Sequence, residues 1–265
     1  MALARSFAIL SRGSNRAGSK PLRAASPEAR LAAVSAAAKA QQLFVSGTLQ
    51  IAADELSLTS VAVAKAPRTR HQSADNSAVA PLWLALLSAE EPGFWPHVSA
   101  QPEFHDGLAN PLDRWSRRAI AALAEALGAK AVFPFGGPPW LPFLRWAERS
   151  GRSFASPVAL HVHDRMGLWA SWRGALVFDQ PLPETAAPGG SPCARCVDQP
   201  CRTACPAQAL VPGAYDLASC HDWLDTPAGN DCLTKGCGVR SACPLSRLYG
   251  RLAAESAHHM RHFHP

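Results

Sequence analysis

All eight cysteines of this chain lie between positions 193 and 243. They form two sets of four, spaced Cys193-x2-Cys196-x4-Cys201-x3-Cys205-Pro206 and Cys220-x11-Cys232-x4-Cys237-x5-Cys243-Pro244. Four thiolates hold one four-iron, four-sulfur cluster, and in bacterial two-cluster ferredoxins the fourth cysteine of a run, followed by proline, ligates the other cluster. Because both sets end in Cys-Pro, the sequence predicts a module with two [4Fe-4S] clusters.

The same crossing rule predicts which cysteines share a cluster. The two predicted ligand sets are Cys193, Cys196, Cys201 and Cys243, and Cys205, Cys220, Cys232 and Cys237. The first run has four residues between its second and third cysteines where the ferredoxin run has two, so Asp198-Gln199-Pro200 is expected to bulge outward. The second set is also stretched, and we expect Gly236 and Gly238 to give its loops backbone freedom.

Three other roles are open to cysteines of this kind. A disulfide framework is typical of small secreted domains, whereas here about 190 residues precede the first cysteine and no long apolar leader opens the chain. Structural zinc is the stronger alternative, because Cys193-x2-Cys196 alone is also half of a zinc site. Inert thiols would not all gather in one fifth of the chain. The alternative function is therefore a zinc-stabilised interaction protein with no redox role.

Length and composition predict a folded protein of several parts. Of the residues, 48% are hydrophobic and 17% charged, as in globular proteins, and no apolar run reaches the roughly 18 residues of a membrane span. The predicted parts are a basic, disordered extension (1–25), an α/β body (26–180), a linker rich in Pro and Gly (181–192), the two-cluster module (193–250) and a His-rich tail expected to fray (251–265).

The net charge of +6 belongs to the N-terminal end of the chain. Residues 1–40 carry seven basic groups and one acidic group, and the rest of the chain holds 19 of each sign. The folded part is therefore neutral, and no nucleic-acid partner is expected. The extension is typical of an organelle transit peptide and equally of a mis-assigned start codon in a bacterial genome. We expect a cytoplasmic protein, or one of an organelle matrix if the extension is a transit peptide.

Local patterns predict the elements of the body. Ser26-Pro27 starts a helix that runs to about position 42, and Asn110-Pro111 starts an amphipathic helix that runs to about position 127. The other expected elements are strands at 43–51, 58–63, 158–162 and 168–178, a polar loop at 65–77, and helices at 79–87 and 141–149. The apolar run at 79–87 is ambiguous, and Pro81 favours a buried helix there over a central strand. Strands that alternate with helices predict an α+β fold with a three-layer body.

Several motifs resemble those of epoxyqueuosine reductase and, more distantly, of the reductive dehalogenases, which join a corrinoid-binding domain to a two-cluster ferredoxin module. The similar pieces cover roughly 100 residues in the same order. They are the segment 144–151 (Leu-Arg-Trp-Ala-Glu-Arg-Ser-Gly), Gly167-Leu168-Trp169, Arg173-Gly174-Ala175-Leu176, Leu182-Pro183, Ala204-Cys205-Pro206 and Cys220-His221-Asp222-Trp223-Leu224. The chain also resembles a group of bacterial ferredoxin-like proteins that share Phe-Pro-Phe-Gly-Gly-Pro-Pro, here residues 133–139.

The body is also similar to the vitamin B12 trafficking protein that decyanates and dealkylates cobalamins. Asn110–Arg114 and the segment from His163 through Trp169, with Arg173-Gly174, carry this likeness. This likeness implies a nitroreductase-like α/β body with a flat cofactor such as a corrinoid or flavin against it, and His163 as one of its contacts. Trp169 is suited to stack on such a ligand, and Arg173 to clamp a phosphate or propionamide edge. A structural histidine, a core tryptophan and a solvated arginine are the plainer interpretations of these three residues.

One departure from the reductase pattern limits what the resemblance implies. Epoxyqueuosine reductase has a catalytic aspartate before its Ser/Thr-x-Pro turn, and the matching stretch 133–139 contains no acid. Epoxide reduction on transfer RNA is therefore not expected. The sequence predicts an iron-sulfur electron-transfer protein that works with a redox partner such as a ferredoxin, a flavodoxin or a reductase. It would be an iron-sulfur dependent oxidoreductase if a corrinoid or flavin binds to its body.

Overall fold

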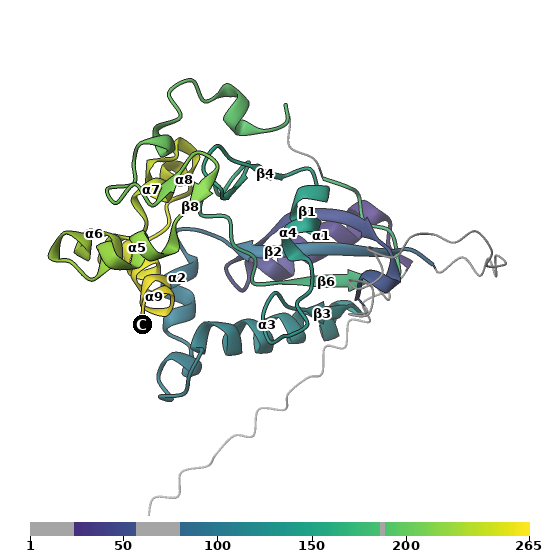
Figure 1. Cartoon of the computed structure of the whole chain (residues 1–265). Coiled ribbons are helices and arrows are strands. Elements are labelled where there is room, and N and C mark those ends of the chain that lie inside the picture. The colour runs from purple at the N-terminus through teal and green to yellow at the C-terminus, as the bar shows by residue number, and fades with distance from the viewer. Residues whose placement is uncertain (1–23, 57–79, 186–188) are drawn as a thin grey trace, which may run out of the picture.

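The computed structural model describes residues 24–56, 80–185 and 189–265. Its core is a four-stranded sheet with the order β1-β2-β6-β3, in which every neighbouring pair is antiparallel. The strands are β1 (Leu43–Ile51), β2 (Leu82–Ala89), β6 (Gly174–Phe178) and β3 (Lys130–Val132). The cysteine-containing elements gather beyond one end of this sheet (Figure 1). The fold is thus mixed α/β with small antiparallel sheets.

Helices cover both faces of the sheet. One face packs against α1 (Pro27–Lys39), α2 (Phe94–Ser99) and α3 (Pro111–Leu127), and the other against α4 (Phe143–Arg149). Residues alternate between the faces along β2, since Ala85 and Leu87 join the first core and Leu84 and Leu86 the second. Trp146 of α4 is fully buried in the second core. The body therefore has three layers, as expected.

The β2 strand corrects our expectation of a helix at 79–87. It pairs with β1 on one side and β6 on the other, so both of its faces and both of its edges are covered. A strand in that position is apolar throughout, and its periodicity cannot be distinguished from that of a buried helix. Pro81 stands just before the strand, where it removes no hydrogen bond from the ladder.

The other predicted elements fall into three groups. The helix at Pro27 begins as predicted, with Ser26 Oγ accepting from Ala29 N at 3.2 Å, and α3 and β1 also follow their predictions. Only parts of 158–162 and 168–178 are strand: β5 (His161–His163) pairs with the unpredicted β4 (Ser153–Ala155), and β6 begins at Gly174. The expected strand at 58–63, the loop at 65–77 and nearly all of the basic extension lie outside the described residues.

The cysteine-containing region is a series of short helices. They are α5 (Leu217–Leu224), α6 (Asn230–Lys235), α7 (Gly238–Ala242), α8 (Pro244–Tyr249) and α9 (Ala253–Phe263), preceded by a hairpin of β7 (Leu210–Val211) and β8 (Ala214–Tyr215). The tail expected to fray is instead α9, which packs against α6 and buries Glu255, Ser256 and His258. Tertiary packing stabilises this helix. No apolar stripe in the sequence predicted it.

The region is packed firmly onto the body. Leu168 N donates to Ser246 Oγ of α8 at 2.9 Å, and the Tyr249 hydroxyl donates to Ala89 O at the end of β2. Gly167 has a φ of 59° and lies so close to Ser246 that a β-carbon there would overlap it. The region is therefore docked against the sheet and does not hang from it on the linker. Among the described residues, no helix is both long and apolar enough to cross a membrane.

Candidate functional site

The first group of thiols comes from two short 3-10 helices and from the residue that links α7 to α8. Cys193 lies in a short 3-10 helix (Pro192–Arg195), Cys201 in a second one (Pro200–Arg202), and Cys243 in the link between α7 and α8. The pKa of Cys193 is raised to about 11, first by burial and then by the neighbouring thiols of Cys201, Cys243 and Cys196. Burial, Cys243 and Cys196 also raise the pKa of Cys201. These four thiols, which the crossing rule groups together, therefore lie near one another.

The second group joins a loop to α5 and α6. Burial raises the pKa of Cys232, a hydrogen bond from the Gly238 backbone lowers it, and the thiols of Cys237, Cys205 and Cys220 raise it again. Burial likewise raises the pKa of Cys220. The hydrogen bond from the Tyr215 hydroxyl lowers it, and the thiols of Cys237 and Cys205 raise it again. Both groups thus combine cysteines from the two halves of the sequence pattern, and all eight thiols are free.

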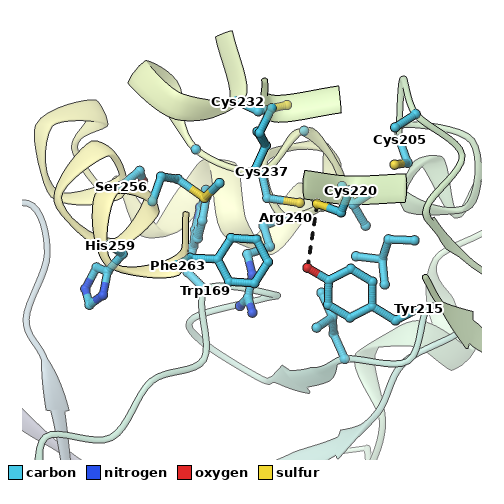
Figure 2. A pocket seen from close by; sticks show the side chains of 18 of the residues that line it. Trp169, Cys205, Tyr215, Cys220, Cys232, Cys237, Arg240, Ser256, His259 and Phe263 are labelled. Atoms are coloured by element: carbon cyan, nitrogen blue, oxygen red, sulfur yellow. Dashed lines mark hydrogen bonds between the residues drawn. The ribbon is translucent and has the colours of Figure 1, made fainter. Parts of the chain in front are cut away.

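The second group lines a cavity of about 280 Å³ between the body and α9. Figure 2 shows Cys205, Cys220, Cys232 and Cys237 along one side, with Trp169, Tyr215 and Phe263 opposite. Arg240, Arg251, Ser256 and His259 complete the polar part of its wall. The cavity therefore brings four thiols together with aromatic and basic side chains from both parts of the fold.

Two sulfur atoms receive hydrogen bonds that bear on this arrangement. The Tyr215 hydroxyl donates to Cys220 Sγ at 3.9 Å, and the Gly238 backbone N–H donates to the Cys232 thiol. Hydrogen bonds to ligand sulfur tune the potential of a bound cluster. Of the two glycines expected to loosen these loops, Gly236 has a φ of 93°, which glycine adopts readily, and Gly238 has no positive φ.

The extended first run bulges as expected. Gln199 adopts a left-handed conformation with a φ of 37°, and Val197 is 95% exposed. The Gln199 side chain turns back, accepting from Arg202 Nη1 at 3.1 Å and donating to Cys193 O at 3.5 Å. The two extra residues therefore project outward, while the cysteines on either side face inward.

The residues described in the structure include no group of three or more His, Cys, Asp or Glu side chains arranged to hold a single metal ion. Around Zn²⁺, thiolates lie about 2.3 Å from the ion and so stand close together. A four-iron, four-sulfur cluster is a larger object, and its four thiolates stand farther apart.

The three residues expected to hold a corrinoid or flavin have different surroundings. His163 is buried: its Nε2 donates to Ser46 O at 2.8 Å and its Nδ1 accepts from Arg165 N at 3.0 Å, so neither ring nitrogen is left for a ligand. Trp169 borders the cavity.

Arg173 is neither a solvated arginine nor a residue of the cavity wall. Its guanidinium is buried, pairs with Asp113 and donates to Ser116 Oγ at 3.1 Å. Burial lowers the pKa of Arg173 while Asp113 opposes that effect. Of the three residues, the structure therefore brings only Trp169 to the cavity.

Sequence reasoning missed most of the cavity wall. Arg251 lies over the Trp169 ring, with its Cζ 4.9 Å from the centroid, and Arg240 donates to Leu168 O. His259 and Phe263 reach the cavity from α9. The cluster of histidines near the C-terminal end was the one available signal, and it gave no indication that the helix folds back over the cysteines.

The stretch Phe-Pro-Phe-Gly-Gly-Pro-Pro lines a second cavity of about 270 Å³ at the β3 edge of the sheet. The Arg117 guanidinium carbon lies 5.3 Å from the Phe133 ring centroid and 5.4 Å from that of Phe135. Trp140 at its rim is 59% exposed. No cysteine lines this cavity.

A scan against protein-family models gave no match, and neither the search of curated proteins nor that of solved structures gave one.

Proposed function

We propose that this chain is an iron-sulfur electron-transfer protein that carries two [4Fe-4S] clusters. The proposed ligands are Cys193, Cys196, Cys201 and Cys243 for the outer cluster, and Cys205, Cys220, Cys232 and Cys237 for the cavity cluster. One observation carries the proposal: eight free thiols are divided into two facing groups of four, and each group takes one cysteine from the other half of the pattern. That division is typical of two-cluster ferredoxins.

The donor set fits iron-sulfur clusters better than zinc. All eight proposed ligands are thiols, and sulfur receives hydrogen bonds from Tyr215 and from the Gly238 backbone. The alternative, a zinc-stabilised interaction protein, accounts for the number of cysteines. It does not account for the way each group of four takes one cysteine from the other half of the sequence pattern. Such clusters supply one-electron transfer at potentials set by burial and by hydrogen bonds to sulfur.

The two groups of thiols differ in their surroundings: Cys201 and Cys243 of the outer group are buried, whereas the four cysteines of the cavity group are each partly exposed. The outer group lies beside the exposed bulge at Val197, where a redox partner such as a ferredoxin, a flavodoxin or a reductase can approach. The cavity group is enclosed between Trp169 of the body and α9. We assign electron delivery to the cavity, whose wall combines thiols with aromatic and basic side chains.

The identity of the electron acceptor is the more specific part of the proposal. A corrinoid or flavin that reaches the cavity would meet Trp169, whereas His163 and Arg173 are engaged in the core. A cofactor bound at this point would make the protein an oxidoreductase, and without one it is an electron carrier. Titration of flavin mononucleotide or cobalamin into the anaerobic protein, followed by visible absorption, separates these two cases.

Metal analysis of protein purified without oxygen tests the proposal. We expect about eight iron and eight acid-labile sulfide per chain, because each cluster contains four of each. About two zinc and no sulfide would refute it and favour the interaction protein.

A matched pair of double variants tests the exchange of ligands. If the cysteines are divided as proposed, Cys201→Ser with Cys243→Ser removes one cluster and leaves about four iron, and Cys201→Ser with Cys205→Ser removes both. If each half of the pattern bound its own cluster, the two results would be reversed. Each variant lacks two thiols, so a general loss of thiols cannot explain a difference between them.

A further inference from the structure

Two glutamates are buried together beside the cavity. Glu91 follows β2 and is 8% exposed, and Glu255 of α9 is 3% exposed. Their carboxyl groups are close enough to share a hydrogen bond. Neither oxygen of Glu91, nor Oε2 of Glu255, has a hydrogen-bond donor among the described residues. Three buried carboxyl oxygens thus face one another without a donor.

A single proton would satisfy this arrangement. Two carboxylates that share a buried site cannot both ionise at ordinary cost, because desolvation and mutual repulsion act in the same direction. Burial raises the pKa of Glu91, and the hydrogen bond with Glu255 and its charge raise it further. Burial acts to raise the pKa of Glu255 too, but His259, Glu91 and Arg251 together lower it. One carboxyl therefore keeps its proton and the other keeps its charge.

The pair has a connection to the cavity. Glu255 Oε1 lies 3.3 Å from Arg251 Nη2 and 3.7 Å from His259 Nε2. Arg251, His259 and Ser256, the residue after Glu255, all line the cavity that contains the second group of thiols. A proton held between Glu91 and Glu255 is thus separated from the cavity by one layer of side chains.

Charged and titratable groups surround the pair from every element packed against it. They are Glu90 beside Glu91, Arg165, which pairs with Glu90, Arg173 just before β6, Tyr249 at the end of α8, Arg251 between α8 and α9, and His258 and His259 on α9. Burial lowers the pKa of both histidines. With Arg251 charged, one shared proton leaves the inner group of Glu91, Glu255 and Arg251 neutral, which is the least costly state for buried charge.

We propose that Glu91 and Glu255 hold one proton between them and donate it to an acceptor that is reduced in the cavity. The inference rests on the proposed function, because that function brings the electron to the cavity. A one-electron carrier protein supplies this electron. In each step the carboxyl O–H bond breaks, an acceptor–H bond forms, and the acceptor gains one electron and one proton. The pair is left with two negative charges until solvent returns a proton.

Infrared spectroscopy tests the shared proton without reference to iron. At neutral pH, the C=O stretch of a protonated carboxylic acid should be present in the wild type and absent in Glu91→Gln and Glu255→Gln. Glu103→Gln is the matched control, because Glu103 is also buried but is ionised by its pair with Arg118. Absence of the band from the wild type, or its persistence in Glu91→Gln, would overturn the proposal.

Electron transfer to two probes tests proton donation. Flavin mononucleotide takes up protons on reduction and ferricyanide takes up none. The protein is first reduced with dithionite, freed of the excess and then mixed with each oxidised probe, so that every electron comes from the protein. We expect Glu91→Gln to slow reduction of the flavin by about 100-fold, a usual contribution of a general acid, and to retain reduction of ferricyanide. Equal slowing of both probes would mean a structural role, and unchanged rates would mean no role. Metal analysis of the same samples shows separately whether the iron-sulfur proposal has failed.

Discussion

Gly167→Ala is expected to separate the cysteine-containing region from the body. Gly167 has a φ of 59°, and a β-carbon at this position would lie 2.6 Å from Ser246 Oγ and closer still to Ser246 N. An ordinary side chain pays about 1 kcal/mol for the left-handed backbone. Overlap with the backbone of a packed helix adds about 1–3 kcal/mol, because α8 must move.

Gly213→Ala is the matched control for the backbone cost. Gly213 has a φ of 76° in the turn between β7 and β8, and a β-carbon there would have nothing within 4 Å. The difference between the two variants is therefore the cost of the overlap at α8. At about 2 kcal/mol, this cost lowers the apparent Tm by about 6 °C more in Gly167→Ala than in Gly213→Ala.

Thermal unfolding at one fixed scan rate, with iron measured before heating, provides the assay. Because α8 follows directly on Cys243, we expect Gly167→Ala also to weaken the outer group of thiols and to lower the iron content. Equal Tm values for the two variants would refute the reasoning, since the region would then not depend on close contact at Ser246.

Three further predictions concern single side chains. Asp113→Ala leaves the buried Arg173 charge without its partner and should lower the free energy of unfolding by about 2 kcal/mol. This is less than the full cost of a broken buried pair, because Asp113 is partly exposed. The apparent Tm of the variant measures the loss. Tyr215→Phe removes the donor to Cys220 Sγ, so it should keep the iron and lower one cluster potential by less than about 59 mV, as measured by redox titration. The pKa of Glu91 is raised from 4.5 to about 10 in the folded protein, so wild-type stability should fall as pH rises through that window, by up to about 3 kcal/mol between pH 6 and 8; Glu91→Gln should remove this slope in thermal unfolding at the two pH values.

The sequence predicted the parts of the site that depend on local spacing. The ligand grouping follows from short covalent separations and the two Cys-Pro ends, and the bulge at Gln199 follows from two extra residues in a loop whose ends are held in place. Helix starts at Pro27 and Pro111 are also local, because proline fixes φ where no N–H is needed.

The rest depended on contacts between distant segments. The apolar run of β2 suits a helix and a central strand equally, and its two neighbouring strands decide between them. Arg173 was expected at the surface or at a ligand, and Asp113 of α3 draws it into the core. Glu91 and Glu255 are 164 residues apart in the sequence, and no pattern in either segment indicates that they meet.

The position of α9 explains why an electron carrier should retain so large a body. Cysteine loops alone can gather eight thiols, as small ferredoxins do. Here one wall of the cavity comes from the body, at Trp169, and another from α9, at His259 and Phe263. The same helix brings Glu255 to Glu91 at the end of β2, so the sheet fixes the distance between the buried carboxyl pair and the cavity. The body thus joins the proposed site for electrons to the proposed site for a proton, which the cysteine loops could not do alone.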